Sequence, residues 1–521
     1  MGWLAERFAA LTARPVFAPL RRRWSLLPPF AQHLFKSLLI GSVAAAVLSF
    51  ARPYVPGLAG AETTATDWAI KFWQDRFDLS PTSNERFVFF DIDQRTYRAW
   101  GEPLFVPRDK LLDLIRFAAE APAKLVVVDV ELAKHVPLGG RVASASPARP
   151  ASSDPVDPDL ALAAYLRGYA TASQPTADGT PPQAAFPHMI FARTIGPRAP
   201  PDAGLKNPPD AVVLREERPS EFLEDVVRAS NVLHWASPLS DRDDDGLVRN
   251  WRLFEPTCLD RTPHAIPSMA LLSWAVLRAP LMSQGAFSPA SFGEELRRRF
   301  APSAATCTPA GASPVASKAS SPEPWVLYDG TLRKRLVLSS RPSDLEQRIF
   351  YKFQASTALA DLFSRVPALL ITERSNQPLS PDLVAGKTVV IGSSYEAGKD
   401  LHQTPIGEMA GAMVVINQIN ALMEFGQFQE VSRGIRWAGL LALIMIFSLS
   451  FSFFTTTWGA QVSTLVMNAV LLPLSLWLFQ YGWWLDLVFP LFVLQAYQKF
   501  IDMDVHPPPV IRRHRHANEE I

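Results

Sequence analysis

A cluster of aspartates in the middle of the chain has the spacing of a calcium loop. The segment SDRDDDGLVRNW contains Asp241, Asp243 and Asp245 at alternate positions, and Gly246 follows them. This order matches the first half of an EF-hand loop, in which alternate carboxylates converge on one hard cation. The second half does not match, because the last position of the loop needs a bidentate glutamate and Arg252 stands there.

The alternative for this segment is a β-hairpin. The residues on both sides of the aspartates predict strands, not the two helices of an EF-hand, and Gly246 would supply the turn. The carboxylates would then pair with Arg242, Arg249 and Arg252, and opposite charges this close cancel much of the field that a cation needs. The hairpin is the favoured interpretation, and a metal site at the three aspartates is the alternative.

A second pair of carboxylates ends an apolar run. In FVFFDIDQRT, Asp91 and Asp93 stand as the nucleophile and the general acid do in haloacid dehalogenase phosphatases. Those enzymes have Thr or Val four residues after the first aspartate, where this chain has Arg95. A lysine and an acidic pair would also be needed to hold magnesium against the aspartyl-phosphate, and Lys387 and Asp400 are candidates for those roles. A periplasmic phosphatase is therefore a minor alternative.

Apolar runs that alternate with amphipathic helices predict an α/β domain with an at least partly parallel sheet. The runs predicted as buried strands are RFVFFDID (86–93), AKLVVVDV (123–130), HMIFARTI (188–195) and KTVVIGSS (387–394). Helices are predicted over residues 108–121 and 410–426. Insertions rich in Pro, Ala and Ser are predicted to be disordered surface loops, since they have few large apolar groups. They span residues 136–158, 172–187, 196–211 and 301–324.

Four apolar spans predict transmembrane helices, because each has about the 20 residues that a helix needs to cross a bilayer. They are residues 30–50, 434–454, 460–479 and 484–500. Arginines before the first span and after the last predict, by the positive-inside rule, that residues 1–29 and 502–521 are cytoplasmic. Residues 51–432 would be periplasmic, and residues 433–501 would hold the last three helices. A cleaved signal peptide is the alternative for the first span.

Composition and cysteine content narrow the class of partner and the compartment. The chain has 51 Lys and Arg against 50 Asp and Glu, so no net field would attract nucleic acid. The two cysteines, Cys258 and Cys307, both fall in the predicted periplasmic segment. In an oxidising compartment an even pair of cysteines favours a disulfide over two thiols.

From about residue 55 to residue 430 the chain resembles the type 2 CHASE domain, an extracytoplasmic sensor module of bacterial receptors. The resemblance begins with FFDIDQRTYRAWGEP, VPRDKLLDLI and VVVDV, and continues in DDDGLVRNW and IPSMALLSW. Its most specific part is GKTVVIGSSYEAGKDLHQTPIGEMAGAMVVINQINALM. This segment resembles the closing strand of the family, its Gly-x-x-Asp-x-x-x-Thr-Pro loop and its last helix.

The resemblance implies which residues serve ligand binding or domain integrity. They are Asp93, Thr96, Arg108, Asp129, Asp245, Arg249, Gly392, Asp400 and Thr404. For GSSYEAG, which begins at Gly392, two interpretations stay open: backbone amides that bind an anion, or a tight turn without a ligand.

The implied protein is a multi-pass receptor of the bacterial inner membrane, without enzymatic activity or cofactor. Family members usually continue into an output domain, whereas here residues 502–521 alone follow the last predicted span. We therefore expect an unknown periplasmic ligand or protein outside, and a separate output protein as signalling partner. A structural or assembly subunit of a cell-envelope complex is the alternative, and an oligomer is compatible with both.

Overall fold

The computed structural model divides the chain into two compact units. Residues 74–428 form one unit, and residues 1–73 and 429–521 form the other. The structure describes residues 85–136, 157–174, 186–197, 215–278, 288–302, 307, 323–328, 335–341, 345–354, 362–373, 379–398, 400–427 and 63–72, with scattered positions within 26–43 and 438–473.

Most of the predicted insertions and membrane spans lie outside these described residues. The insertions at 136–158, 172–187, 196–211 and 301–324 and the spans at 30–50, 434–454, 460–479 and 484–500 are described at few positions or none. Within the described part of the chain, we find no helix that combines the length and the apolar character needed to cross a bilayer.

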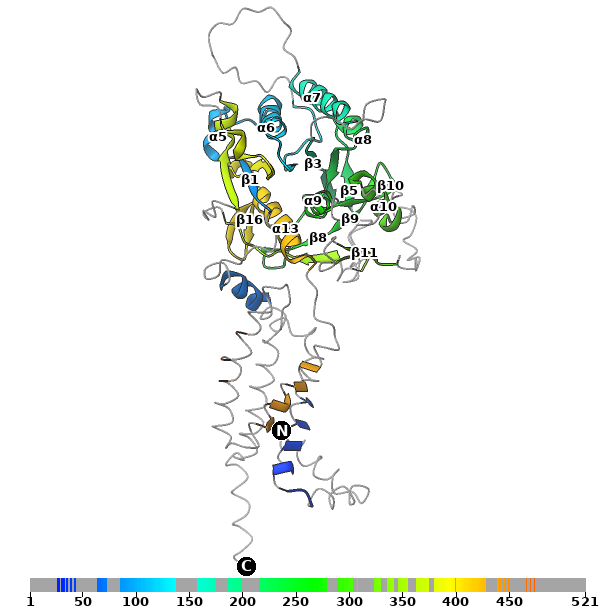
Figure 1. Ribbon diagram of the computed structural model, residues 1–521, viewed down its shortest axis with the longest axis vertical. Helices are drawn as coiled ribbons and strands as arrows, with labels where there is room; N and C mark the ends of the chain where they lie inside the picture. Colours follow the sequence, from blue (N-terminus) through cyan, green and yellow to red (C-terminus); the bar gives the residue numbers. More distant parts are fainter. Residues whose placement is uncertain are drawn as a thin grey trace, which may run out of the picture. The chain divides into compact units, whose positions relative to one another are not determined.

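A parallel sheet of six strands forms the centre of the unit at residues 74–428 (Figure 1). In order across the sheet, its strands are β14 (Phe363–Pro367), β1 (Phe87–Ile92), β15 (Thr388–Ser393), β2 (Leu125–Val128), β3 (His188–Ala192) and β6 (Leu233–Ala236). All five neighbouring pairs run parallel. The predicted α/β class and parallel pairing are thus confirmed, and β15 inserts between β1 and β2.

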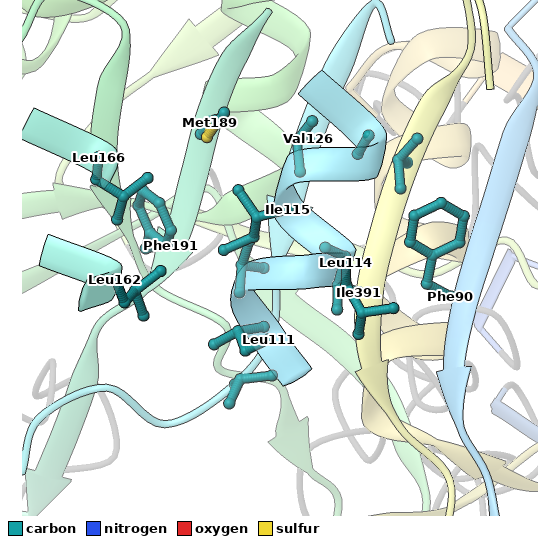
Figure 2. Close-up of a cluster of buried hydrophobic side chains, with 14 of the residues drawn as sticks. Phe90, Leu111, Leu114, Ile115, Val126, Leu162, Leu166, Met189, Phe191 and Ile391 are labelled. Carbon is teal, nitrogen blue, oxygen red and sulfur yellow. The ribbon is translucent and has the colours of Figure 1, made fainter. Parts of the chain in front are cut away.

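Helices cover both faces of this sheet, which explains why its strands are apolar at consecutive positions. The helices around it are α5 (Gln94–Ala99), α6 (Arg108–Glu120), α7 (Pro158–Ala172), α8 (Glu224–Arg228), α9 (Met269–Arg278), α12 (Ala368–Thr372) and α13 (Gly411–Phe425), whereas α10 (Pro289–Phe300) packs on β10 (Thr262–Pro267) outside this sheet. Figure 2 shows side chains of α6 and α7 packed against one face, among them Leu114 beside Phe90 and Ile391. On the other face, α13 packs on β15 and α9 packs on β2 and β3.

The remaining strands form smaller sheets. A four-stranded sheet has the order β10 (Thr262–Pro267), β9 (Phe254–Leu259), β5 (Arg215–Arg218) and β4 (Thr194–Pro197). A three-stranded sheet has the order β13 (Glu346–Arg348), β8 (Val248–Arg252) and β7 (Asp241–Arg242). Two hairpins are β11 (Trp325–Tyr328) with β12 (Arg335–Leu338), and β16 (Leu401–Thr404) with β17 (Gly407–Ala410).

The junction between the two larger sheets corrects one predicted strand. Residues 188–195 are not one strand, because the chain leaves β3 at Arg193 and enters β4 in the four-stranded sheet. Arg193 is buried and makes ion pairs with Glu217 (3.0 Å) and Glu224 (2.6 Å). In the same region, Cys258 of β9 forms a disulfide with Cys307, with Cα atoms 5.7 Å apart.

Candidate functional site

The aspartate cluster is a hairpin built around one buried arginine. Strands β7 and β8 flank a turn at Gly246, whose φ of 83° suits glycine. Arg249 is 5 % exposed, and it donates to Asp243 Oδ2 (2.7 Å) and to Asp245 Oδ2 (2.6 Å). Its hydrogen bonds lower the pKa of Asp245 to about 2. Strands thus stand where an EF-hand would need helices.

Asp241, the first aspartate of the predicted calcium loop, also has arginine partners. One predicted pairing in the hairpin is wrong. Asp241 pairs with Arg215 (3.0 Å) and with Arg252 (3.1 Å). Arg242, which we expected to join this cluster, instead bonds His402 Nδ1 (3.3 Å), because β8, the strand paired with its own strand β7, packs against β16. Within the residues that the structure describes, no group of three or more His, Cys, Asp or Glu side chains could hold a metal ion.

Asp93 and Thr96 fasten α5 to its surroundings. Asp93 is the N-cap of α5, and its carboxylate accepts from the Thr96 amide at 2.7 Å. The Thr96 side chain is buried, and its hydroxyl accepts from the amide of Leu369 in α12 at 3.3 Å. Both side chains are therefore occupied by the fold, as in an ordinary helix cap.

Arg108 forms a buried ion pair that the sequence did not predict. It is 2 % exposed, and its Nε lies 3.2 Å from Asp159 Oδ1 at the start of α7. Its guanidinium also donates to the backbone carbonyl of Glu131, 3.0 Å away in the segment after β2. Asp159 accepts in addition from the Val136 amide at 2.8 Å. Arg108 thus joins two helices and a loop, which is a role in domain integrity.

Thr404 closes the turn of the β16–β17 hairpin. Its hydroxyl donates to the Gly407 carbonyl at 2.6 Å, across a turn in which Gly407 has φ 121°. The turn after β15 is occupied in a similar way. The amides of Ser394, Glu396 and Gly398 bond Ile92 O (3.1 Å), Gln94 Oε1 (3.2 Å) and Tyr395 O (3.2 Å). These donors are taken by the protein, which favours the tight turn over an anion site.

The other three predicted residues, Gly392, Asp129 and Asp400, meet at the carboxyl edge of the sheet. In the register of the sheet, Gly392 of β15 lies opposite Asp91 of β1, and the Asp129 amide donates to Ile391 O at 2.8 Å. A Cβ at Gly392 would lie 3.6 Å from the Asp129 Cβ and closer than 3.0 Å to the Cβ of Ala412. Glycine is therefore required where α13 begins on the sheet.

The Asp400 side chain lies against Gly411, the first residue of α13. Its carboxylate occupies the space where a Cβ of Gly411 would stand, and its carbonyl accepts from the Gly411 amide at 2.9 Å. The N-cap residue, Ala410, makes no side-chain hydrogen bond, so Asp400 supplies the negative charge that stabilises a helix N-terminus. Asp400 also lies 3.2 Å from His402 Nε2. Through His402 and Arg242, the closing loop therefore contacts the aspartate hairpin.

Burial favours the protonated forms of Asp129 and Asp91. Burial raises the pKa of Asp129 to about 8, and the nearby charge of Asp400 adds to this. Burial also raises the pKa of Asp91, although Arg365 of β14 opposes the shift from 2.6 Å. Burial raises the pKa of Tyr395, and the nearby Tyr97, whose ring stacks on it at 4.2 Å, and Asp400 add to this. The raised pKa values favour the protonated carboxyl groups of Asp91 and Asp129.

The lysine of the phosphatase alternative lies at the wrong edge of the sheet. The Lys387 carbonyl accepts from the Lys124 amide at 2.8 Å, before β15 and β2 begin, whereas Asp91 is near the end of β1. The Lys387 ammonium donates to Leu383 O at 2.8 Å. This geometry keeps Lys387 away from the Asp91 carboxylate.

Sequence reasoning did not identify two small residues and one histidine that help to assemble this edge. Gly411 and Ala412 stand at the start of the last predicted helix, and His402 lies two residues after Asp400. A pair of small residues at a helix start, following a strand that ends in glycine, is the signal that could have indicated close packing there.

Together, the fold and the site define an α/β domain whose candidate site lies at the carboxyl edge of a parallel sheet. A family model described as CHASE2 domain matches residues 41–454, which is most of the chain. The chain therefore belongs to the CHASE2 domain family, as its motifs predicted. This is a family of extracytoplasmic sensor domains, not of catalytic ones. No curated protein and no solved structure matches the chain.

Proposed function

We propose that this protein is a multi-pass sensor of the bacterial inner membrane, with its CHASE2 domain in the periplasm and its signal passed to a separate output protein. One observation carries the proposal. Asp400 of the closing loop lies on the first residue of α13 and contacts the aspartate hairpin through His402. A ligand or protein that moves either loop would therefore act on the start of one helix.

Helix α13 has the contacts of a rigid element that could carry such a movement. The Asn417 side chain is fully buried and accepts from the amides of Lys352 (2.7 Å) and Phe353 (2.9 Å). Glu424, near the end of the helix, pairs with the Lys352 ammonium at 3.2 Å. Polar partners at two turns fix the rotation of the helix, so we expect it to move as one body between two arrangements.

The proposed topology places residues 51–432 in the periplasm, residues 30–50 and 433–501 in the membrane, and residues 1–29 and 502–521 in the cytoplasm. The apolar spans and the flanking arginines support it, and the Cys258–Cys307 disulfide fits an oxidising compartment. Alkaline phosphatase inserted after residue 200 should be active, and fused to the C-terminus inactive. An active C-terminal fusion would refute the topology.

The sensor role is tested by thermal unfolding of the full chain in lipid nanodiscs. Fractions of a small-molecule extract from periplasm should contain one that raises the melting temperature, because a ligand selective for the folded state stabilises it. Asp400→Asn should reduce this rise, and Asp382→Asn, in an exposed turn away from the site, should not. If no fraction has an effect and the protein instead co-purifies with an envelope complex, the assembly-subunit alternative gains support.

The partner is tested by replacing residues 434–501 with three unrelated spans of equal length. Membrane insertion should persist, whereas association with the output protein should be lost, because we propose that the native spans form the docking surface. Unchanged association would mean that the outer domain binds the partner.

A further inference from the structure

The two aspartates at the start of α13 face the same helical turn. A Cβ at Gly392 would contact both Ala412 and Asp129, and a Cβ at Gly411 would overlap the Asp400 carboxylate. Because Gly411 and Ala412 are consecutive, the Asp400 carboxylate and the Cβ of Asp129 both lie beside the first turn of α13. Two negative charges in a partly desolvated place repel each other strongly unless one is neutralised.

The groups around Asp129 bear on whether its carboxyl keeps a proton. The carboxyl edge around Asp129 carries Asp91 and Asp93 at the end of β1, Arg365 on β14, Tyr395 and Asp400 after β15, His402 on β16 and Glu131 two residues further along the chain. On the other side, Arg193 follows β3 and pairs with Glu217 and Glu224. Arg365 pairs with Asp91 and His402 with Asp400. The first turn of α13 has no ionisable side chain, and α9 has none before Arg278. Asp129 is left without a cation among the described residues.

We propose that Asp129 and Asp400 form a proton-operated latch on α13. While Asp129 holds its proton, Asp400 keeps its place on Gly411 and stabilises the start of the helix. When Asp129 releases its proton to solvent, the two carboxylates repel each other, and Asp400 with its loop moves away from the helix.

The latch would open on the alkaline side of neutrality. Burial and Asp400 raise the pKa of Asp129 to about 8, so at pH 7 about nine-tenths of the molecules hold the proton. The device goes beyond the proposed ligand sensor, because the proton itself is the signal and no ligand or output protein is needed. The latch and the proposed sensor can therefore fail independently.

Backbone hydrogen exchange of the full chain in lipid nanodiscs tests the latch, with rates corrected for the intrinsic effect of pH. For amides at residues 411–416, protection should fall about tenfold between pH 7 and pH 9, as expected for one proton released on opening. Amides of α6 should show no such change. In Asp129→Asn, whose neutral amide imitates the protonated acid, protection should stay high at both pH values.

Two further variants keep the test decisive. Asp400→Asn removes the repulsion and should also abolish the pH dependence, which covers the case that Asp129→Asn does not fold. Asp109→Asn, an exposed aspartate in the first turn of α6, should keep the wild-type profile. If the amides at residues 411–416 of the wild-type protein keep their protection up to pH 9, the latch is overturned. A wild-type pH profile in Asp129→Asn or Asp400→Asn would overturn it equally.

Discussion

The contact between Gly392 and Ala412 predicts a destabilising substitution with a specific rescue. Gly392→Ala places a methyl group closer than 3.0 Å to the Ala412 Cβ, whereas carbon atoms pack at about 3.5 to 4.0 Å. Strand β15 is central in the sheet, so the start of α13 would have to move away from it. Overpacking of this size costs about 1 to 3 kcal/mol of unfolding free energy.

Ala412→Gly should rescue this variant, because it removes the methyl group with which the new side chain clashes. The other neighbours of the new Cβ, Asp129 O at 3.5 Å and Asp129 Cβ at 3.6 Å, are at ordinary contact distances. Alone, Ala412→Gly should cost about 1 kcal/mol through helix propensity. The loss of unfolding free energy in the double variant should therefore be smaller, by about 1 to 2 kcal/mol, than the sum of the losses in the two single variants.

Denaturant unfolding of the full chain in detergent, followed by the fluorescence of the buried Trp251 and Trp274, measures these free energies. Gly168→Ala on α7 is the matched control. No atom lies within 4 Å of its new methyl group, so it should stabilise by about 0.5 to 1 kcal/mol. Additive effects of the Gly392 and Ala412 changes, or a neutral Gly392→Ala, would refute the proposed contact.

Three other outcomes follow from buried groups. Arg108→Met should lower the unfolding free energy by about 3 to 5 kcal/mol, because it leaves Asp159 buried without its cation; an effect below 1 kcal/mol in the same unfolding assay would contradict the ion pair. His188 and His234 share a hydrogen bond of 3.0 Å. Burial, and to a smaller extent the neighbouring His188, lowers the pKa of His234 to about 3. Stability should therefore fall as the pH drops below about 6.5, by up to about 1.4 kcal/mol per pH unit, and a His234→Leu variant with an unchanged pH profile would refute this. Cys307→Ser opens a loop whose ends are 49 residues apart, so it should cost about 4 kcal/mol on the chain-entropy estimate, provided that the wild type is unfolded without reductant.

Parts of the fold were predictable because burial on both faces makes strands apolar throughout. The strands β1, β2 and β15 are of this kind, and the sequence predicted all three. Strand β5 has the sequence REER, and its one buried side chain is Glu217. Because Glu217 is stabilised there by Arg193, Thr257 and His264 from other elements, no local pattern could predict the strand.

The candidate site was predictable as a set of residues but not as a place. Resemblance to a family indicated Asp129, Gly392 and Asp400 without saying that they meet. Their meeting depends on the insertion of β15 between β1 and β2, and strand order is a property of the whole sheet. The same resemblance also indicated Asp93 and Arg108, which serve a helix cap and a buried ion pair.

The late position of β15 in the chain also affects synthesis of the domain. Strand β2 ends at Val128 and β15 begins at Thr388, 260 residues later. At typical rates of translation this interval takes roughly 13 to 52 s, during which β1 and β2 have no partner between them. Unpaired strand edges bind other strands, so the nascent chain needs protection until its centre arrives. A fragment that stops before Thr388 would lack the middle of its sheet, and a cell that makes it would accumulate aggregates instead of half a domain.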